Sequence, residues 1–182
     1  SLAPIDVDDL LSADLVGFST TTGTTPPAYE LADRLREQGR PVVFGGAHVT
    51  FLPDEGLQHA DYVVRGEGHT AMLELVEALE TGGDVSQIAG LSYHDVNGPV
   101  HNPDRPFCPE AVFADLPEPD LRLIVGHEAM LTMPIMTQWG CPFNCEFCSV
   151  IKMFGRRVRA RHVEDVLDQL ERVPPGKDVF FY

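Results

Sequence analysis

Three cysteines within eight residues are the part of this sequence best suited to chemistry. Cys141, Cys145 and Cys148 follow the spacing Cys-x3-Cys-x2-Cys, and thiolates are preferred ligands of zinc and of iron–sulfur clusters. Because Pro142 disfavours a continuous helix and Gly140 tolerates unusual backbone angles, the loop can wrap three sulfur atoms around one object. A structural zinc ion takes four protein ligands, whereas a [4Fe–4S] cluster held by three thiolates keeps one iron atom free. The number of thiols therefore favours the cluster.

A zinc knuckle is the alternative, and it needs a fourth ligand. The candidates are His162 and Cys108, and neither has ordinary zinc spacing from the three cysteines. Cys108 stands alone between prolines, and we expect it to be a half-buried structural thiol. On this interpretation the chain is a non-catalytic, ligand-binding Rossmann-like module with a structural metal knuckle.

The cysteine segment resembles the radical S-adenosylmethionine (SAM) superfamily. The resemblance rests on the pattern Cys-x3-Cys-x-aromatic-Cys in residues 141–148 and on the Met-Thr-Gln-Trp-Gly sequence of residues 136–140. It implies that the three cysteines bind a [4Fe–4S] cluster, that SAM binds its fourth iron, and that Phe147 packs near the adenine. The implied chemistry is reductive cleavage of SAM to a 5′-deoxyadenosyl radical. A small-molecule substrate and a reductant such as flavodoxin or ferredoxin are the implied partners.

Residues 14–19, 43–48 and 60–68 resemble the cobalamin-binding-type domain that precedes the radical SAM barrel in one subgroup. That subgroup includes anaerobic cyclases and methyltransferases, so the resemblance implies cobalamin as a further cofactor. In such domains a serine-containing loop after one strand and a Gly-Gly pair after the next line the nucleotide tail of cobalamin. The residues that match these places are Ser19, Thr21, Gly45 and Gly46.

One motif of those domains is absent from this sequence. Cobalamin domains that bind the cofactor with its tail displaced carry an Asp-x-His-x-x-Gly loop after their first strand, and this chain has none. The place of that loop would fall before Ser1, so either the loop was removed with the first strand or the parent protein never had it. We expect a fragment of a longer enzyme that lacks the first strand and most of the barrel, and that is inactive by itself.

The pattern of the first hundred residues predicts the elements that position these side chains. Apolar runs at residues 15–18, 41–44 and 62–64 predict strands, each followed by a segment with helical periodicity. Alternation of this kind is typical of βαβ units. The predicted fold class for residues 1–100 is therefore α/β, a Rossmann-like parallel sheet with flanking helices. His48, Glu67 and His69 follow strands as well, and each is either a ligand contact or an ordinary loop residue.

A hairpin and a linker are predicted next. Residues 91–93 and 100–101 flank Asn97 and Gly98, a dipeptide that tolerates the positive φ of a hairpin turn. Residues 102–120 carry five prolines and show little periodicity, so we expect them to be extended and to lie over the surface. The linker as a whole is assigned to residues 101–132.

Residues 133–182 are predicted to begin the radical SAM domain. A strand at residues 133–138, the cysteine loop, a helix at residues 163–173 and a strand at residues 178–182 follow one another. They form the first strand–helix–strand unit of an incomplete radical SAM α/β barrel.

Composition limits the classes of partner and the cellular compartment that we expect for this chain. The formal net charge of −15 argues against nucleic acid as a partner, because binding phosphates requires surplus Lys and Arg. The sequence has no apolar run near the roughly 18 residues of a membrane span. Four cysteines without a secretion signal indicate a reducing compartment, so we expect a cytoplasmic protein.

A basic stretch after the cysteines is suited either to bind an anion or to form a solvated turn and helix start. It consists of Lys152, Arg156, Arg157, Arg159 and Arg161.

Overall fold

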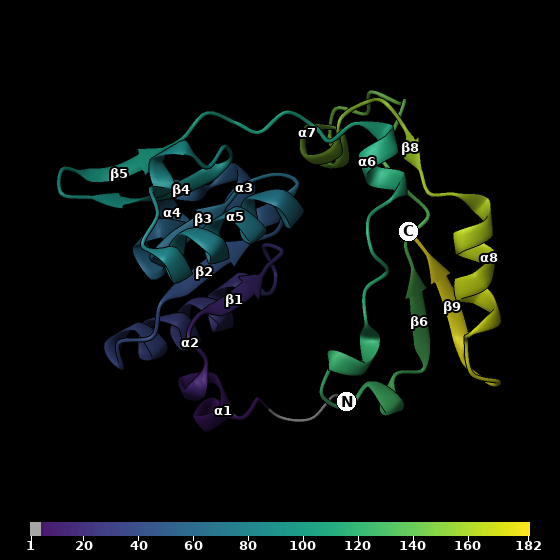
Figure 1. The fold of residues 1–182 in the computed structure, drawn as a ribbon, viewed down its shortest axis with the longest axis horizontal. Coiled ribbons are helices and arrows are strands. Elements are labelled where there is room, and N and C mark those ends of the chain that lie inside the picture. Colours follow the sequence, from purple (N-terminus) through teal and green to yellow (C-terminus); the bar gives the residue numbers. More distant parts are fainter. Residues whose placement is uncertain (1–4) are drawn as a thin grey trace. The chain divides into compact units, whose positions relative to one another are not determined.

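A computed structural model describes residues 5–182, and it divides the chain into two compact units whose main segments are Asp6–Phe107 and Cys108–Tyr182. The first unit has a five-stranded sheet with helices on both faces (Figure 1). The second unit has two small sheets of two strands each. The predicted α/β class is confirmed.

The sheet of the first unit has the strand order β1-β2-β3-β4-β5. The parallel strands β1 (Val16–Ser19), β2 (Val42–Gly45) and β3 (Tyr62–Val64) lie where the apolar runs predict them. The predicted hairpin consists of β4 (Leu91–Asp95) and β5 (Gly98–His101), and β4 pairs antiparallel with β3. The sheet is therefore mixed rather than purely parallel, because the hairpin extends it beyond β3.

Helices cover both faces of this sheet (Figure 1). α1 (Val7–Ser12), α2 (Thr25–Glu37), α3 (Ala47–Phe51) and α4 (Pro53–His59) pack on one face, and α5 (Gly68–Thr81) packs on the other. α2 begins at the two prolines, as predicted, since the fixed φ of proline suits the first turn of a helix. The sequence pattern does not predict α1 and α3, because elements of 6 and 5 residues are too short to show a helical period.

The sheet divides the core in two, because successive side chains of a strand point to opposite faces. In β2, Val42 and Phe44 pack with the face that α2 covers, whereas Val43 packs with the face that α5 covers. The 3-10 helix η1 (Val85–Gln87) contributes to the α5 face. Since both faces are covered, the ends of the strands are left for a ligand.

The predicted strand–helix–strand unit is present in the second unit. β6 (Thr132–Ile135) and β9 (Asp178–Phe181) are parallel neighbours, and α8 (Val163–Glu171) lies between them in the chain. The apolar side of α8 is not buried within this unit, since Val163 is 66% and Leu167 is 51% exposed.

The strand predicted over residues 133–138 is wrong as a single element. β6 is followed by β7 (Gln138–Trp139), which pairs antiparallel with β8 (Arg159–Ala160). The change of partner takes place at Thr137, whose N–H and hydroxyl donate to the carbonyl oxygen of Tyr182 at 2.7 and 3.1 Å. The spacing of apolar residues does not predict that the chain changes its pairing strand at this point.

The predicted linker, residues 101–132, is not extended throughout. This segment contains α6 (Glu110–Ala114) and the 3-10 helices η2 (Leu121–Leu123) and η3 (His127–Ala129). Phe113 of α6 is fully buried. The prolines here flank a short helix whose large apolar side chain packs into the second unit.

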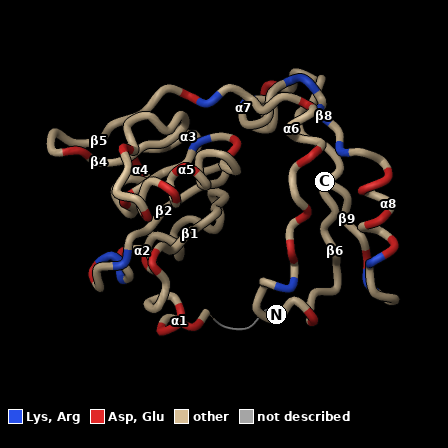
Figure 2. The backbone as a smooth tube through the Cα atoms, viewed as in Figure 1, with Lys and Arg blue, Asp and Glu red and all other residues tan. Residues whose placement is uncertain are grey.

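Asp and Glu outnumber Lys and Arg in both units (Figure 2). The acidic residues include a run in the first turn of α8, where Glu164 and Asp165 face the positive end of the helix dipole. Among the helices that the structure describes, none is long and apolar enough to cross a membrane.

Candidate cofactor sites

The carboxyl ends of β1, β2 and β3 meet at one edge of the sheet, because the three strands are parallel. Ser19 and Gly45 are register partners at this edge. The N–H of Thr20 donates to the carbonyl oxygen of Gly45 at 3.0 Å. Two of the four residues predicted to contact cobalamin therefore lie side by side.

Gly46 allows the loops after β1 and β2 to touch through their backbones. Its φ is +92°, which favours glycine. A Cβ atom at this position would lie 2.6 Å from the carbonyl oxygen of Thr20 and 3.1 Å from the hydroxyl of Ser19. The structure thus brings Gly46 together with Ser19 and Gly45, and close packing of the two loops requires a glycine there.

Thr21 lies in the turn that follows this contact. Its N–H donates to the hydroxyl of Thr24 at 3.0 Å, and that hydroxyl lies 3.1 Å from the carbonyl oxygen of Thr21. The hydroxyl of Thr25 donates to the same carbonyl at 2.8 Å. Thr21 is exposed and belongs to a turn ordered by threonine side chains.

Thr20 is a candidate that sequence reasoning misses. It is 4% exposed, and its hydroxyl is buried without a hydrogen-bond partner among the residues that the structure describes. A buried hydroxyl left unpaired costs about 1–3 kcal/mol. This hydroxyl, beside Ser19 and Gly46, fits a polar group of a ligand such as the cobalamin tail. Thr20 stands in a run of hydroxyl residues, and nothing in the sequence separates it from its neighbours.

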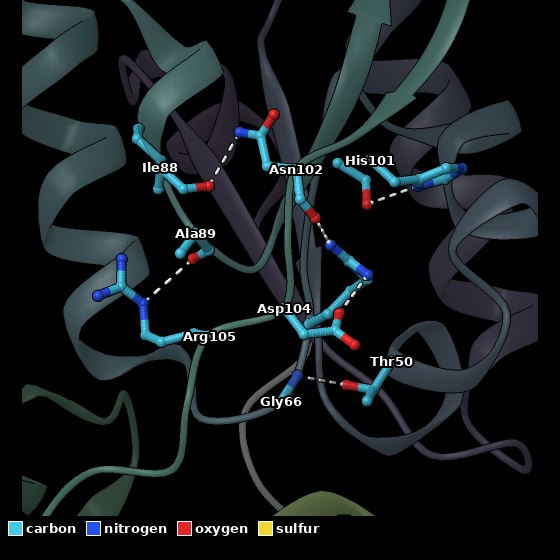
Figure 3. A network of polar contacts seen from close by, with 10 residues as sticks. Thr50, Gly66, Ile88, Ala89, His101, Asn102, Asp104 and Arg105 are labelled. Carbon is cyan, nitrogen blue, oxygen red and sulfur yellow. Dashed lines mark hydrogen bonds and ion pairs between the residues drawn. The ribbon is translucent and has the colours of Figure 1, made fainter.

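A polar network fixes the end of β3 (Figure 3). The guanidinium of Arg65 donates to the carboxylate of Asp104, at 2.6 Å, and to the carbonyl oxygen of Asn102. The side-chain amide of Asn102 donates to the carbonyl oxygen of Ile88 at 2.9 Å, and Arg105 donates to Ala89 at 3.1 Å. The chain after β5 is therefore held against the end of β3.

Glu67 and His69 come shortly after β3 in the chain. Glu67 is 4% exposed and is the residue before the first turn of α5. His69 lies within that turn. Both therefore stand at the carboxyl edge of β3, in line with the ordinary topology of an open α/β sheet.

The three predicted cluster ligands lie on the loop between β7 and β8, which also contains α7 (Val150–Phe154). Cys145 is exposed, Cys141 and Cys148 are half-buried, and the four cysteines form no disulfide. In the described part of the chain, no group of three or more His, Cys, Asp or Glu side chains converges closely enough to hold a metal ion. The three thiols share a loop but do not form such a group. Phe147, predicted to lie near adenine, is 92% exposed.

The base of the cysteine loop is closely packed. The N–H of Cys141 donates to the carbonyl oxygen of Gly155 at 3.1 Å. Gly140 has a φ of +89°, and a Cβ atom there would lie 2.1 Å from the carbonyl oxygen of Arg157. Three free thiols therefore lie on a loop whose ends are fixed, and this set of donors fits the chemistry of an iron–sulfur cluster.

The basic stretch after the cysteines is not a single free patch. Arg159 is 3% exposed and donates to the carbonyl oxygens of Phe154 and Cys108 at 2.6 and 3.1 Å. Arg157 pairs with Glu110 at 3.0 Å. These arginines therefore bind groups of the chain itself, a role that neither interpretation of the basic stretch includes.

The two candidate fourth ligands of a zinc knuckle lie in other surroundings. His162 is 59% exposed at its side chain and lies 3.5 Å from a carboxylate oxygen of Asp115. Cys108 is half-buried, as expected, and its sulfur is 3.2 Å from the guanidinium of Arg159. No observation on either residue favours the knuckle.

Comparison with known proteins finds a family model that matches most of the first unit. Residues 7–76 match the family model described as the B12 binding domain. The uncharacterized methyltransferase PH0819 of Pyrococcus horikoshii is 39% identical over 86% of this chain and 36% of its own length. The anaerobic magnesium-protoporphyrin IX monomethyl ester cyclase of Rubrivivax gelatinosus is 32% identical over 94% of this chain and 33% of its own length. The chain thus spans about a third of these relatives.

Two solved structures share the fold over 91% of this chain. The radical SAM methyltransferase TsrM from Kitasatospora setae, with cobalamin and a [4Fe–4S] cluster bound, has a TM-score of 0.71 at 21% identity over 36% of its length. The cobalamin-dependent SAM radical enzyme OxsB, with aqua-cobalamin and SAM bound, has a TM-score of 0.74 at 24% identity over 24% of its length. Residues 7–76 match the model of the B12 binding domain, and the chain has the fold of the matching part of these two solved structures.

Proposed function

We propose that this chain is the cobalamin-binding and cluster-binding part of a radical SAM enzyme that carries out methyl transfer or cyclisation on a small-molecule substrate. One observation carries the proposal: a B12-binding domain and a Cys-x3-Cys-x2-Cys loop occur in one chain. The relatives described as a methyltransferase and as a cyclase support these two reaction types.

In this proposal the tail of cobalamin binds at the carboxyl edge of β1 and β2. Ser19 and Thr20 offer hydroxyl groups, and Gly45 lets the ligand approach the backbone. Gly46 contacts the tail from the loop that it holds against Ser19 and Thr20. The exposed Thr21 contacts the tail from the turn beyond. Cobalamin, when bound, supplies a carrier for the transferred group. The buried hydroxyl of Thr20 supports this placement, because a polar ligand atom would satisfy it.

The cysteine loop serves the other cofactors in this proposal. Cys141, Cys145 and Cys148 ligate a [4Fe–4S] cluster, and binding gathers the three thiols around it. Phe147 then packs against the adenine of SAM. The cluster, when bound, supplies the electron that cleaves SAM. A flavodoxin or ferredoxin is the proposed reductant, and the reducing cytoplasm is the proposed compartment.

Iron and sulfide analysis after anaerobic reconstitution tests the cluster. We expect about four iron atoms per chain, a loss of iron in each of the three variants Cys141→Ala, Cys145→Ala and Cys148→Ala, and full iron content in Cys108→Ala. One equivalent of zinc without iron–sulfur absorbance would instead support the structural metal knuckle and contradict the proposal.

A further inference from the structure

The loops at the carboxyl edge of β1, β2 and β3 are tied together by side chains of the short helix α3. We infer that His48 and Thr50 are positioning residues for cobalamin, which hold the three loops in their binding geometry without touching the cofactor. The inference rests on the proposed function and adds residues to its site.

Thr50 joins the loops after β2 and β3. Its hydroxyl donates to the carbonyl oxygen of Gly46 at 2.8 Å. The same hydroxyl accepts a hydrogen bond from the N–H of Gly66 at 3.0 Å (Figure 3). A hydroxyl has one proton to donate and lone pairs to accept, so both bonds form at once. The position of Gly66 is thereby set relative to Gly46.

His48 joins the loop after β1 to α4. Its Nε2 lies 2.9 Å from Oε1 of Glu55, and its Nδ1 lies 3.2 Å from the hydroxyl of Thr22. Because an ionised carboxylate only accepts, Nε2 carries the proton in the neutral ring, and Nδ1 accepts from Thr22. The backbone N–H of His48 donates to the carbonyl oxygen of Thr20 at 3.2 Å. His48 thus holds two residues of the loop after β1, Thr20 and Thr22.

Aromatic packing holds His48 itself in place. The ring of His48 is edge-on to Tyr29 with centroids 6.3 Å apart, and Tyr29 stacks on His59 at 4.0 Å. His59 is bonded to Asp33 at 2.9 Å. Burial, and the nearby carboxylate of Glu55, raise the pKa of Tyr29 to about 12.

These contacts converge on the proposed cofactor edge. The carbonyl oxygen of Thr20, the residue with the buried unpaired hydroxyl, accepts a hydrogen bond from the N–H of His48. The carbonyl oxygen of Gly46 accepts one from the hydroxyl of Thr50. One helix of 5 residues therefore reaches all three loops. Loss of the hydrogen bonds made by His48 and Thr50 would leave the strands in place, because the apolar cores on both faces of the sheet remain. The loops would then be free to move relative to one another.

Hydroxocobalamin titration of the whole chain, followed by its visible spectrum, tests the inference with three threonine variants. Thr50→Val removes the hydroxyl at constant shape, and Thr50→Ser keeps it. Thr81→Val is the matched control, because the hydroxyl of Thr81 also donates to a carbonyl four residues back, that of Glu77 at 2.7 Å, but at the far end of α5. We expect Thr50→Val to weaken binding about tenfold, Thr50→Ser to bind within about twofold of the unaltered chain, and Thr81→Val to bind as the unaltered chain does.

A second pair of variants tests His48 through its partner. Glu55→Ala removes the carboxylate that lies 2.9 Å from His48, and the control Asp54→Ala removes the neighbouring carboxylate of α4, which lies 3.1 Å from His101 of β5. We expect weaker hydroxocobalamin binding in Glu55→Ala by about threefold to tenfold and unchanged binding in Asp54→Ala. Thermal unfolding of all variants is measured in parallel, and this pair decides the matter if Thr50→Val does not fold.

The outcomes separate the inference from the proposed function. If the unaltered chain binds hydroxocobalamin and Thr50→Val and Glu55→Ala bind it equally well, the inference is wrong and the proposed function stands. Equal weakening in the Thr81→Val and Asp54→Ala controls would also overturn the inference, because the loss of binding would then follow from a general loss of stability. If the unaltered chain does not bind at all, the proposed function fails and the inference fails with it.

Discussion

The guanidinium of Arg159 lies over the indole ring of Trp139, 5.8 Å from the ring centroid, where the cysteine loop begins and ends. The two residues are register partners in the β7–β8 pair. The same guanidinium donates to the carbonyl oxygens of Phe154 and Cys108. A single buried side chain therefore connects both ends of the loop, its α7 helix and the segment before α6.

Arg159 should contribute strongly to stability. Arg159→Ala leaves buried carbonyl oxygens without a charged donor, so we expect the free energy of unfolding to fall by about 2–3 kcal/mol. Arg157→Ala is the control, since that side chain is 80% exposed and exposed ion pairs contribute less than about 1 kcal/mol. Urea unfolding followed by the fluorescence of Trp139, the one tryptophan of the sequence, measures both. Equal losses in the two variants would contradict the role given to Arg159.

Gly140 should be required for the cysteine loop. Gly140→Ala places a methyl group 2.1 Å from the carbonyl oxygen of Arg157, and the backbone must move to accommodate it. Gly176→Ala has a similar positive φ, +83°, but nothing within 4 Å. Both changes cost about 1–2 kcal/mol for the backbone angle, and we expect Gly140→Ala to cost clearly more and to lower the iron bound on reconstitution. Similar iron content and unfolding midpoints in the two variants would count against a closely packed loop base.

Thr20→Val should separate stability from binding. The variant removes a buried hydroxyl that has no partner in the described chain, so the free energy of unfolding should rise by about 1 kcal/mol in the absence of cobalamin. Hydroxocobalamin affinity should fall, because the ligand loses that partner. Urea unfolding and titration measure the two effects. A destabilised variant with unchanged affinity would show that Thr20 has a structural role only.

Alkaline pH should destabilise the chain through Tyr29. Its pKa is raised from 10.0 to about 12, so between these values the unfolded chain has lost the phenolic proton and the folded chain retains it. Stability from this group is thus complete below pH 10 and is lost as the pH rises toward 12, by on the order of 1–2 kcal/mol. Unfolding free energies of the unaltered chain and of Tyr29→Phe, measured from pH 9 to 12, check this. Identical slopes in the two proteins would exclude Tyr29 as the cause.

The sequence predicts the first unit well because its signals are local. Three apolar runs and a pair of prolines locate β1, β2, β3 and the start of α2. The topology then places Ser19 beside Gly45, since parallel strands end at the same edge of a sheet. The pairing of Ser19 with Gly45 is therefore predictable from the apolar pattern and from the topology of parallel sheets.

The remaining features depend on contacts between distant residues. Arg159 bonds to Cys108, 51 residues away, and Phe113 packs against Trp139 with ring centroids 4.9 Å apart. Neither contact leaves a periodic signal, so α6 and the closed base of the cysteine loop are not predicted. The unpaired hydroxyl of Thr20 likewise follows from burial, which a run of threonines does not reveal.

Cobalt and iron analysis of one reconstituted sample tests the central claim most directly. After anaerobic reconstitution with hydroxocobalamin, iron and sulfide, followed by gel filtration, we expect about one cobalt and four iron atoms per chain. Cys145→Ala should keep the cobalt and lose the iron. A chain that emerges without cobalt, or a Cys145→Ala variant with unchanged iron, would contradict the account.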